Sequence, residues 1–180
     1  MTRCSFPYRR ICVIGTTGSG KSALAKRIAC RLDLAYIELD ALHWESGWTE
    51  VPPDIFRQRV EGVTSSPAWV VDGNYHAVRD ITWQRAEAVV WLDYPFSVIL
   101  WRLWWRTWKR AVTHEVLWNG NRESLWLHFF TKDSLFLWMF QTYHLRKREY
   151  PLLIAMPEHA HLKIIHLTSP AQTGKWIDTL

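Results

Sequence analysis

One stretch of the sequence decides the fold: Gly15-Thr16-Thr17-Gly18-Ser19-Gly20-Lys21-Ser22. It matches the pattern G-x-x-x-x-G-K-[ST], in which a glycine-rich loop turns its backbone N–H groups inward around phosphates. The preceding run, 10–14, is apolar enough for a buried strand, and the following run, 23–32, has helical periodicity. Strand, glycine loop and helix in this order predict a phosphate-binding site at a helix N-terminus.

Each part of the loop has an expected role. The loop amides hold the phosphates of a nucleotide, Lys21 reaches the outer phosphates, and Ser22 offers its hydroxyl to Mg²⁺. The expected nucleotide-binding residues are therefore Gly15, Thr16, Thr17, Gly18, Ser19, Gly20, Lys21, Ser22 and Ala23.

Three further apolar runs, 35–40, 69–72 and 88–93, each end in a carboxylate. Because ligands of an open parallel sheet bind beyond the carboxyl ends of its strands, Asp40 and Asp72 are expected to face the loop. We expect Asp72 to hold the water shell of Mg²⁺, and Asp40 to contact an acceptor hydroxyl as a general base. Acidic residues after strands are also common turn formers and caps, an alternative that stays open for both and is favoured for Asp93.

The nucleotide base is expected to be adenine. A guanine-specific site would carry N/T-K-x-D late in the chain, whereas here Thr131-Lys132 is followed at once by Asp133. The predicted cofactors are therefore ATP and Mg²⁺.

The composition favours one domain with an anionic partner. Apolar residues make up 48% of the 180 residues and charged residues 22%, which is ample for a single buried core. The formal net charge is +5, and the basic excess lies between Arg102 and Arg148, so phosphate, nucleic acid or an acidic membrane surface would all fit. The longest uncharged apolar stretch, 134–145, is too short to span a bilayer, and the N-terminal residues contain no signal-peptide core. We therefore expect no transmembrane segment and a cytoplasmic location.

Several motifs together resemble the adenylate-kinase-like P-loop proteins of the FlaR-related topology modulation group, within the nucleoside monophosphate kinase superfamily. The resemblance covers most of the chain and rests on the loop, Leu39-Asp40-x-Leu42-x-Trp44, Gly47-Trp48 and Trp69-Val70-Val71-Asp72-Gly73-Asn74-Tyr75. It implies a three-layer α/β fold whose five-stranded parallel sheet, in the order 2-3-1-4-5, is flanked by helices and carries a lid insertion. The chain is then a single domain, residues 1–180, with an acceptor-binding segment at about 40–66 and a lid at about 110–131.

The resemblance also implies site residues. Arg102 and Arg106, one helical turn apart after Leu92-Asp93-Tyr94-Pro95, would hold the adenine and phosphate groups of the nucleotide. Arg122, in the loop 113–124, would close over the γ-phosphate, and the basic cluster 146–148 would neutralise the transferring phosphoryl group. The expected catalytic residues are Lys21, Asp40, Arg102, Arg106, Arg122 and Arg148. The expected acceptor-binding residues are Asp40, His43, Trp44, Asp72, Gly73, Asn74, Tyr75 and Arg79.

One position departs from the pattern of this superfamily. Where monophosphate kinases place an arginine to clamp the acceptor's phosphate, this chain has His76. Arg79 could reach the site from the next turn, and Arg57 and Arg59 lie on the helix that follows Trp48. An acceptor with a hydroxyl and a flat or apolar body is therefore as consistent with the sequence as a nucleoside monophosphate.

The segment 98–110 combines tryptophans with basic residues. Four tryptophans share one side of the predicted helix: Trp101, Trp104, Trp105 and Trp108. A basic ridge lies on another side and consists of Arg102, Arg106, Lys109 and Arg110. We expect the indoles to be core and the basic ridge to line the nucleotide cleft; an interfacial membrane helix or a base-stacking surface for single-stranded nucleic acid are the alternatives. The function expected is a P-loop kinase that transfers the γ-phosphoryl group of Mg-ATP to a small acceptor. The alternative is an ATP-dependent regulatory protein that binds nucleic acid or a membrane through this helix.

Overall fold

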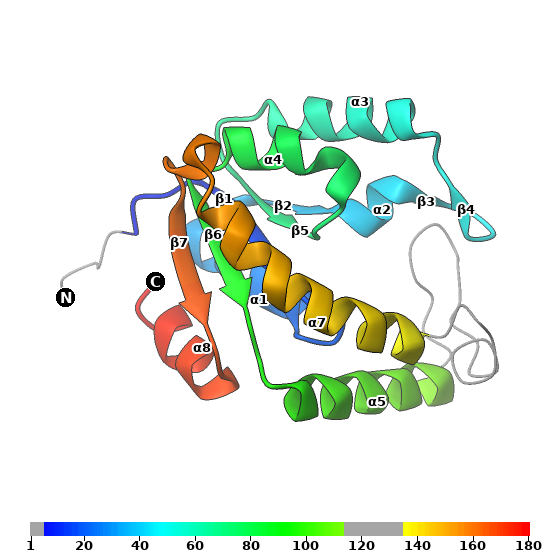
Figure 1. The fold of residues 1–180 in the computed structure, drawn as a ribbon. Helices are drawn as coiled ribbons and strands as arrows, with labels where there is room; N and C mark the ends of the chain where they lie inside the picture. Colours follow the sequence, from blue (N-terminus) through cyan, green and yellow to red (C-terminus); the bar gives the residue numbers. More distant parts are fainter. Residues whose placement is uncertain (1–5, 114–134) are drawn as a thin grey trace.

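The structure, a computed structural model, describes residues 6–113 and 135–180 (Figure 1). Its centre is a parallel five-stranded sheet in the spatial order β2-β5-β1-β6-β7. The strands are β1 (Arg10–Gly15), β2 (Ala35–Glu38), β5 (Trp69–Asp72), β6 (Ala88–Leu92) and β7 (Lys163–Leu167). Counted along the chain, this order is 2-3-1-4-5, so the predicted fold class and sheet order are confirmed.

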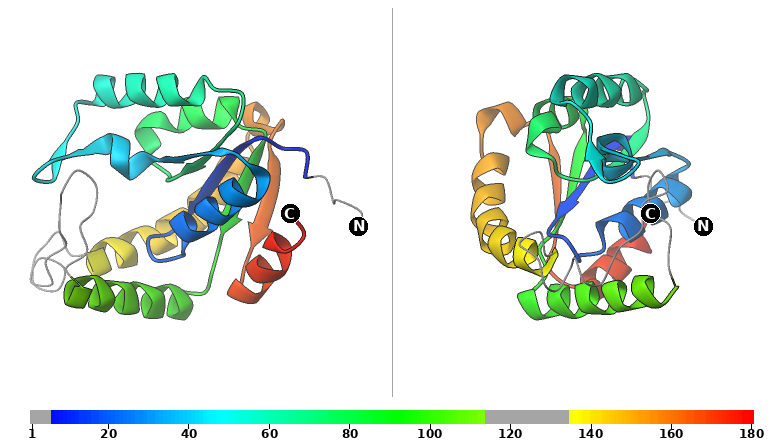
Figure 2. Two further views of the ribbon diagram at one scale, coloured as in Figure 1. Left: turned by 180° about the vertical axis from the view of Figure 1, so that it is seen from behind. Right: turned by 90° about the vertical axis from the view of Figure 1, so that its right-hand side faces the viewer.

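Helices pack on both faces of the sheet (Figure 2). Side chains alternate between the faces along each strand, so Ile11 and Val13 of β1 join one core while Cys12 and Ile14 join the other. The first core also contains residues of α1, α5, α7 and α8, and the second contains residues of α3, α4 and the far end of α7. The helices are α1 (Lys21–Leu32), α3 (Pro53–Thr64), α4 (Arg79–Arg85), α5 (Phe96–Thr113), α7 (Leu135–Ile154) and α8 (Pro170–Ile177).

Short elements join the second and third strands of the sheet. Helix α2 (Leu39–His43) follows β2 directly, and the hairpin β3 (Trp44–Glu45) and β4 (Thr49–Glu50) comes next. The predicted strand 35–40 therefore ends at Glu38, and Asp40 lies in the first turn of α2 rather than at a strand end. The carboxylate still lies at the carboxyl edge of the sheet, because Glu38 is paired in register with Asp72 of β5.

The last two helices complete the fold. Helix α7 runs to Ile154, with Pro151 inside its last turn. At the start of α8, Ser169 is the N-cap and accepts a hydrogen bond from the backbone N–H of Gln172 at 3.2 Å, with Pro170 in the first turn. Of the predicted lid, 110–131, the part after Thr113 lies outside the described residues.

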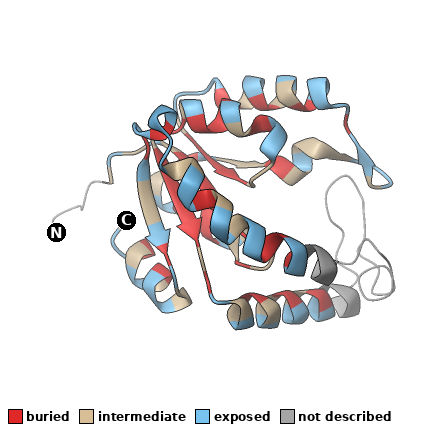
Figure 3. Cartoon of the chain, in the orientation of Figure 1, coloured by how far each residue is buried: buried red, intermediate tan, exposed pale blue. Residues whose placement is uncertain are grey.

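The tryptophans of α5 are not core, so that prediction is wrong. All four side chains are between 42% and 63% exposed, and their rings stack along the helix, as with Trp104 on Trp108 at 6.2 Å between centroids. Figure 3 shows exposed residues alternating with buried ones along α5. The buried stripe of α5 is Ile99, Leu103 and Thr107 instead. The phosphate loop explains why this stripe, rather than the tryptophans, is buried. The loop approaches Ile99 and Leu103 so closely that a Cβ at Gly18 would lie 3.0 Å from the Ile99 carbonyl oxygen. Indoles would not fit there.

Within residues 6–113 and 135–180, none of the helices has both the length and the apolar character needed to cross a bilayer.

Candidate nucleotide and acceptor site

The glycine loop turns between β1 and α1 at the carboxyl edge of the sheet (Figure 1). Gly20 precedes α1 with φ +93°, a left-handed conformation that suits glycine, and a Cβ there would lie 3.1 Å from a guanidinium nitrogen of Arg102. The N–H of Ser19 donates to the carbonyl of Thr16 at 3.1 Å. Because no side chain caps α1, the N–H groups of its first turn can bind an anion.

Lys21 points back over the loop, where its ammonium donates to the carbonyl oxygen of Thr16 at 3.3 Å. Burial lowers the pKa of Lys21 to about 8, opposed by the charges of Asp72 and Asp40 and reinforced by those of Arg146 and Arg106. The negative charge of a bound triphosphate would raise this pKa again. The same interactions also show that both carboxylates lie within electrostatic reach of the lysine.

Asp72 ends β5 and is only 3% exposed. The hydroxyl of Tyr36 donates to its Oδ2 at 3.1 Å, while its Oδ1 is buried with no hydrogen-bond partner among the described residues. Burial raises the pKa of Asp72, against the influence of the Lys21 charge and the Ser22 hydroxyl. A buried acceptor oxygen without a partner, close to a serine hydroxyl and the phosphate loop, fits the water shell of a hard cation.

A Mg²⁺ ion at this place would be bound through Ser22 and Asp72. The described residues contain no group of three or more His, Cys, Asp or Glu side chains that could hold a metal. Mg²⁺ would therefore take its other ligands from nucleotide phosphates and water, as this ion commonly does in kinases.

A cavity of about 340 Å³ opens beside the loop, within the usual range of ligand pockets. Arg102 of α5 fixes one wall, because its guanidinium donates to the Ser19 carbonyl at 2.8 Å and lies over the ring of Tyr94 at 5.1 Å. The opposite wall belongs to α8. The lining residues are Gly18, Gly20, Ala23, Leu24, Arg27, Tyr94, Arg102, Arg106, Pro170, Thr173 and Gly174.

Asp40 lies on the other side of the loop, with the acceptor segment. Its Oδ1 accepts a hydrogen bond from the hydroxyl of Tyr75 at 2.5 Å. The ring of Tyr75 in turn lies 4.6 Å from that of His43, which also contacts Trp44 and Phe56 at 4.9 Å each. The result is a carboxylate with aromatic rings beside it.

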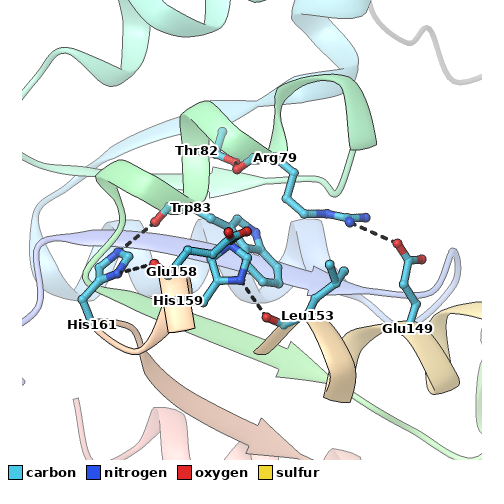
Figure 4. Close-up of polar contacts among 8 residues, drawn as sticks. All are labelled: Arg79, Thr82, Trp83, Glu149, Leu153, Glu158, His159 and His161. Carbon is cyan, nitrogen blue, oxygen red and sulfur yellow. Dashed lines mark hydrogen bonds and ion pairs between the residues drawn. The ribbon is translucent and has the colours of Figure 1, made fainter. Parts of the chain in front are cut away.

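Other expected site residues take different partners. Arg79 is 13% exposed and forms an ion pair with Glu149 of α7 at 3.0 Å, with its guanidinium over Trp83 (Figure 4). Asn74 donates to the hydroxyl of Tyr150. Arg148 is exposed on α7, and Arg122 lies outside the described residues.

Two further residues lie beside the site. Arg146, part of the basic cluster 146–148 expected to neutralise the phosphoryl group, acts on the charge of Lys21 and shares the inner stripe of α7 with the buried Tyr143 and Tyr150. Tyr36, the donor to Asp72, was not selected from the sequence and could have been found only from the pairing of β2 with β5.

These features define a P-loop kinase fold. No protein-family model matches the chain, and no curated protein is similar enough in sequence to match it.

Solved structures of kinases are similar to this chain over nearly its whole length. Shikimate kinase from Bacteroides thetaiotaomicron is 18% identical with a TM-score of 0.56, and the match covers 95% of both chains. Shikimate kinase from Acinetobacter baumannii, solved with shikimate, is 18% identical with a TM-score of 0.54 over 94% of this chain and 89% of that one. A sugar kinase from Janibacter is 20% identical with a TM-score of 0.51 over 96% and 91%. At such identities the likeness concerns the fold.

Proposed function

We propose that this protein is a small-molecule kinase of the adenylate-kinase-like group, related to the FlaR-type proteins, which transfers the γ-phosphoryl group of Mg-ATP to an acceptor hydroxyl. The observation that carries the proposal is the placement of two carboxylates around Lys21. Asp72 is buried beneath the loop with an unpartnered oxygen, and Asp40 lies at the acceptor segment. A metal-binding carboxylate and a separate acceptor base are what phosphoryl transfer from a P-loop requires.

Each residue of the site has one role in the proposed reaction. The loop amides and Lys21 orient the triphosphate, and Mg²⁺, held by Ser22 and Asp72, would offset the charge of its outer phosphates. Asp40 takes the proton of the acceptor hydroxyl while that oxygen bonds to the γ-phosphorus and the bond to the β-γ bridging oxygen breaks, releasing ADP. The hydrogen bond from Tyr75 holds the carboxylate of Asp40 in place for this role.

The remaining expected residues complete the proposal. Arg102 and Arg106 hold the nucleotide in the cavity of about 340 Å³, and Arg122 and Arg148 add positive charge during transfer. Residues 1–180 act as one domain, in which 40–66 binds the acceptor and 110–131 serves as the lid.

The test is ADP formation by the purified protein with Mg-ATP against a panel of nucleotides, nucleosides, sugars and small alcohols. We expect one compound class to stimulate turnover. Lys21→Ala should abolish turnover with the fold intact, and Asp40→Asn should still bind ATP but lose transfer, by roughly 10²-fold or more. Normal transfer by Asp40→Asn would show that the base is another group.

A second function is favoured by the exposed indoles of α5. Four tryptophans stacked beside a basic ridge suit an ATP-dependent regulatory protein that binds nucleic acid or an acidic membrane surface. Such binding would weaken steeply between low and moderate salt, and would occur without any acceptor being phosphorylated. Trp104→Ser with Trp108→Ser should abolish it and leave ATP binding unchanged.

A further inference from the structure

We infer that the acceptor carries no negative charge: it is a hydroxyl compound with a flat or apolar body and without a phosphate or carboxylate group. The inference rests on the proposed function and names the substrate class of the same site. It comes from the partners of the arginines on the acceptor side and from the rings beside Asp40.

The arginines closest in sequence to the acceptor side are already paired with carboxylates. Arg57 donates to both oxygens of Asp80, at 3.0 and 2.7 Å, and also to the carbonyl of Ala77 at 2.5 Å. Arg59 donates to Glu45 at 2.9 Å and to a backbone carbonyl at 3.2 Å. A guanidinium binds an anion through its paired N–H donors, and in both arginines these donors already bind a carboxylate and a backbone carbonyl.

Arg79, a third arginine on the acceptor side within the part of the chain that the structure describes, is held in the same way. It forms its ion pair with Glu149 at 3.0 Å and is mostly buried between α4 and α7 (Figure 4). Releasing it toward an acceptor would leave the half-buried Glu149 without this partner, which costs free energy. Arg79 therefore positions α7 against α4.

The charge of the acceptor segment points the same way. Residues 40–66 contain five carboxylates and two arginines, although the whole chain has a net charge of +5. Within this segment Glu50 lies 3.8 Å from His43, so its charge also faces the aromatic cluster. An anionic acceptor would approach an acidic surface and be repelled by it.

Aromatic rings, rather than charged side chains, lie beside Asp40. His43, Trp44 and Tyr75 are each partly exposed beside Asp40, and their rings meet at 4.6 to 4.9 Å. Such rings bury a flat or apolar body and select for shape rather than charge.

Arg146 does not supply the missing clamp. It lines a small pocket together with Thr16 of the phosphate loop, and its charge lowers the pKa of the Lys21 ammonium, so it lies beside the loop. There it serves the phosphoryl group in transfer, which comes from ATP whatever the acceptor is.

The experiment compares matched pairs of acceptors with Mg-ATP: nucleosides against their 5′-monophosphates, sugars against their sugar acids, and aromatic alcohols against their hydroxy acids. We expect kcat/KM for the neutral member of the active pair to exceed that for the anionic member by at least about tenfold, roughly the effect of one unfavourable charge contact.

A variant tests the cause. Glu45→Gln removes the carboxylate partner of Arg59 and leaves only its hydrogen bond to the Leu42 carbonyl, so kcat/KM for the anionic member should rise several-fold relative to that for the neutral member. Glu61→Gln is the matched control, because it removes a charge from the same segment without freeing that arginine.

The outcomes separate the two claims. A higher kcat/KM for the anionic member in the wild-type protein overturns the inference and leaves the kinase standing. Equal increases from Glu45→Gln and Glu61→Gln would assign the selectivity to the acidic charge of residues 40–66 rather than to the pairing of Arg59, and would still support the inference. Tight ATP binding with no phosphorylation of any pair overturns the proposed function, and this inference with it.

Discussion

Replacement of Lys21 by methionine is expected to stabilise the nucleotide-free protein while abolishing its function. Methionine keeps the length of the side chain and removes a buried charge. The pKa of Lys21 falls from 10.5 to about 8 on folding, chiefly through burial, and at 1.36 kcal/mol per unit this corresponds to a cost of about 3 kcal/mol in folding free energy.

The pH dependence gives this prediction its sign. Below pH 8 the ammonium is charged in both the folded and the unfolded state, so the whole cost is present. Between pH 8 and 10.5 the unfolded chain binds the proton that the folded protein has released, and stability rises with pH as the cost disappears. Lys21→Met should therefore exceed the wild type by about 3 kcal/mol at pH 7 and by roughly half of that at pH 9.5.

The assay is urea unfolding of both proteins at the two pH values, so that the titrating groups that do not interact with Lys21 cancel in the difference. Calorimetry with Mg-ATP at pH 7 should detect binding by the wild type alone. The reasoning is refuted if the advantage of Lys21→Met does not shrink between pH 7 and 9.5, or if the wild type is the more stable protein at pH 7.

Three further changes test the site from other directions. Asp72→Asn keeps the shape of the buried side chain but not its charge, and should lower turnover by roughly 10²-fold and raise the Mg²⁺ concentration at half-maximal rate; an unchanged Mg²⁺ titration would remove Asp72 from the metal site. Gly73→Ala should lower the free energy of unfolding by about 1–3 kcal/mol, because φ is +134° and the new Cβ would lie 2.9 Å from the Cβ of Leu39; a melting temperature equal to the wild type would contradict this. Arg102→Lys should weaken ATP binding by roughly tenfold in calorimetry, since an ammonium cannot both stack on Tyr94 and donate to the Ser19 carbonyl as a guanidinium does; equal affinity would mean that charge alone matters there.

The sequence pattern was sufficient to predict the phosphate loop, because the same residues determine both its backbone conformation and its chemistry. The spacing from Gly15 to Ser22 requires positive φ at Gly18 and Gly20 and the start of a helix at Lys21, and the structure has all three. The buried runs that became β5 and β6 needed only continuous apolar residues, which is typical of strands covered on both faces.

The sequence pattern predicted the wrong buried face of α5, because two faces of this helix both have the spacing of a buried stripe. The tryptophans of α5 have helical spacing, but so do Ile99, Leu103 and Thr107, and only the latter fit against a loop that approaches as closely as Gly18 allows. The same limit applies to Arg79, whose partner Glu149 lies 70 positions away in the chain.

The sequence by itself therefore determined the phosphate loop, whose residues are adjacent in the chain, and placed Asp40 and Asp72 at the carboxyl edge of a parallel sheet; the strand order was implied by the resemblance to the adenylate-kinase-like proteins. The tertiary structure alone decided which arginines are paired with carboxylates and which face of α5 is exposed, because those properties arise between segments that meet only when the sheet and its helices are assembled.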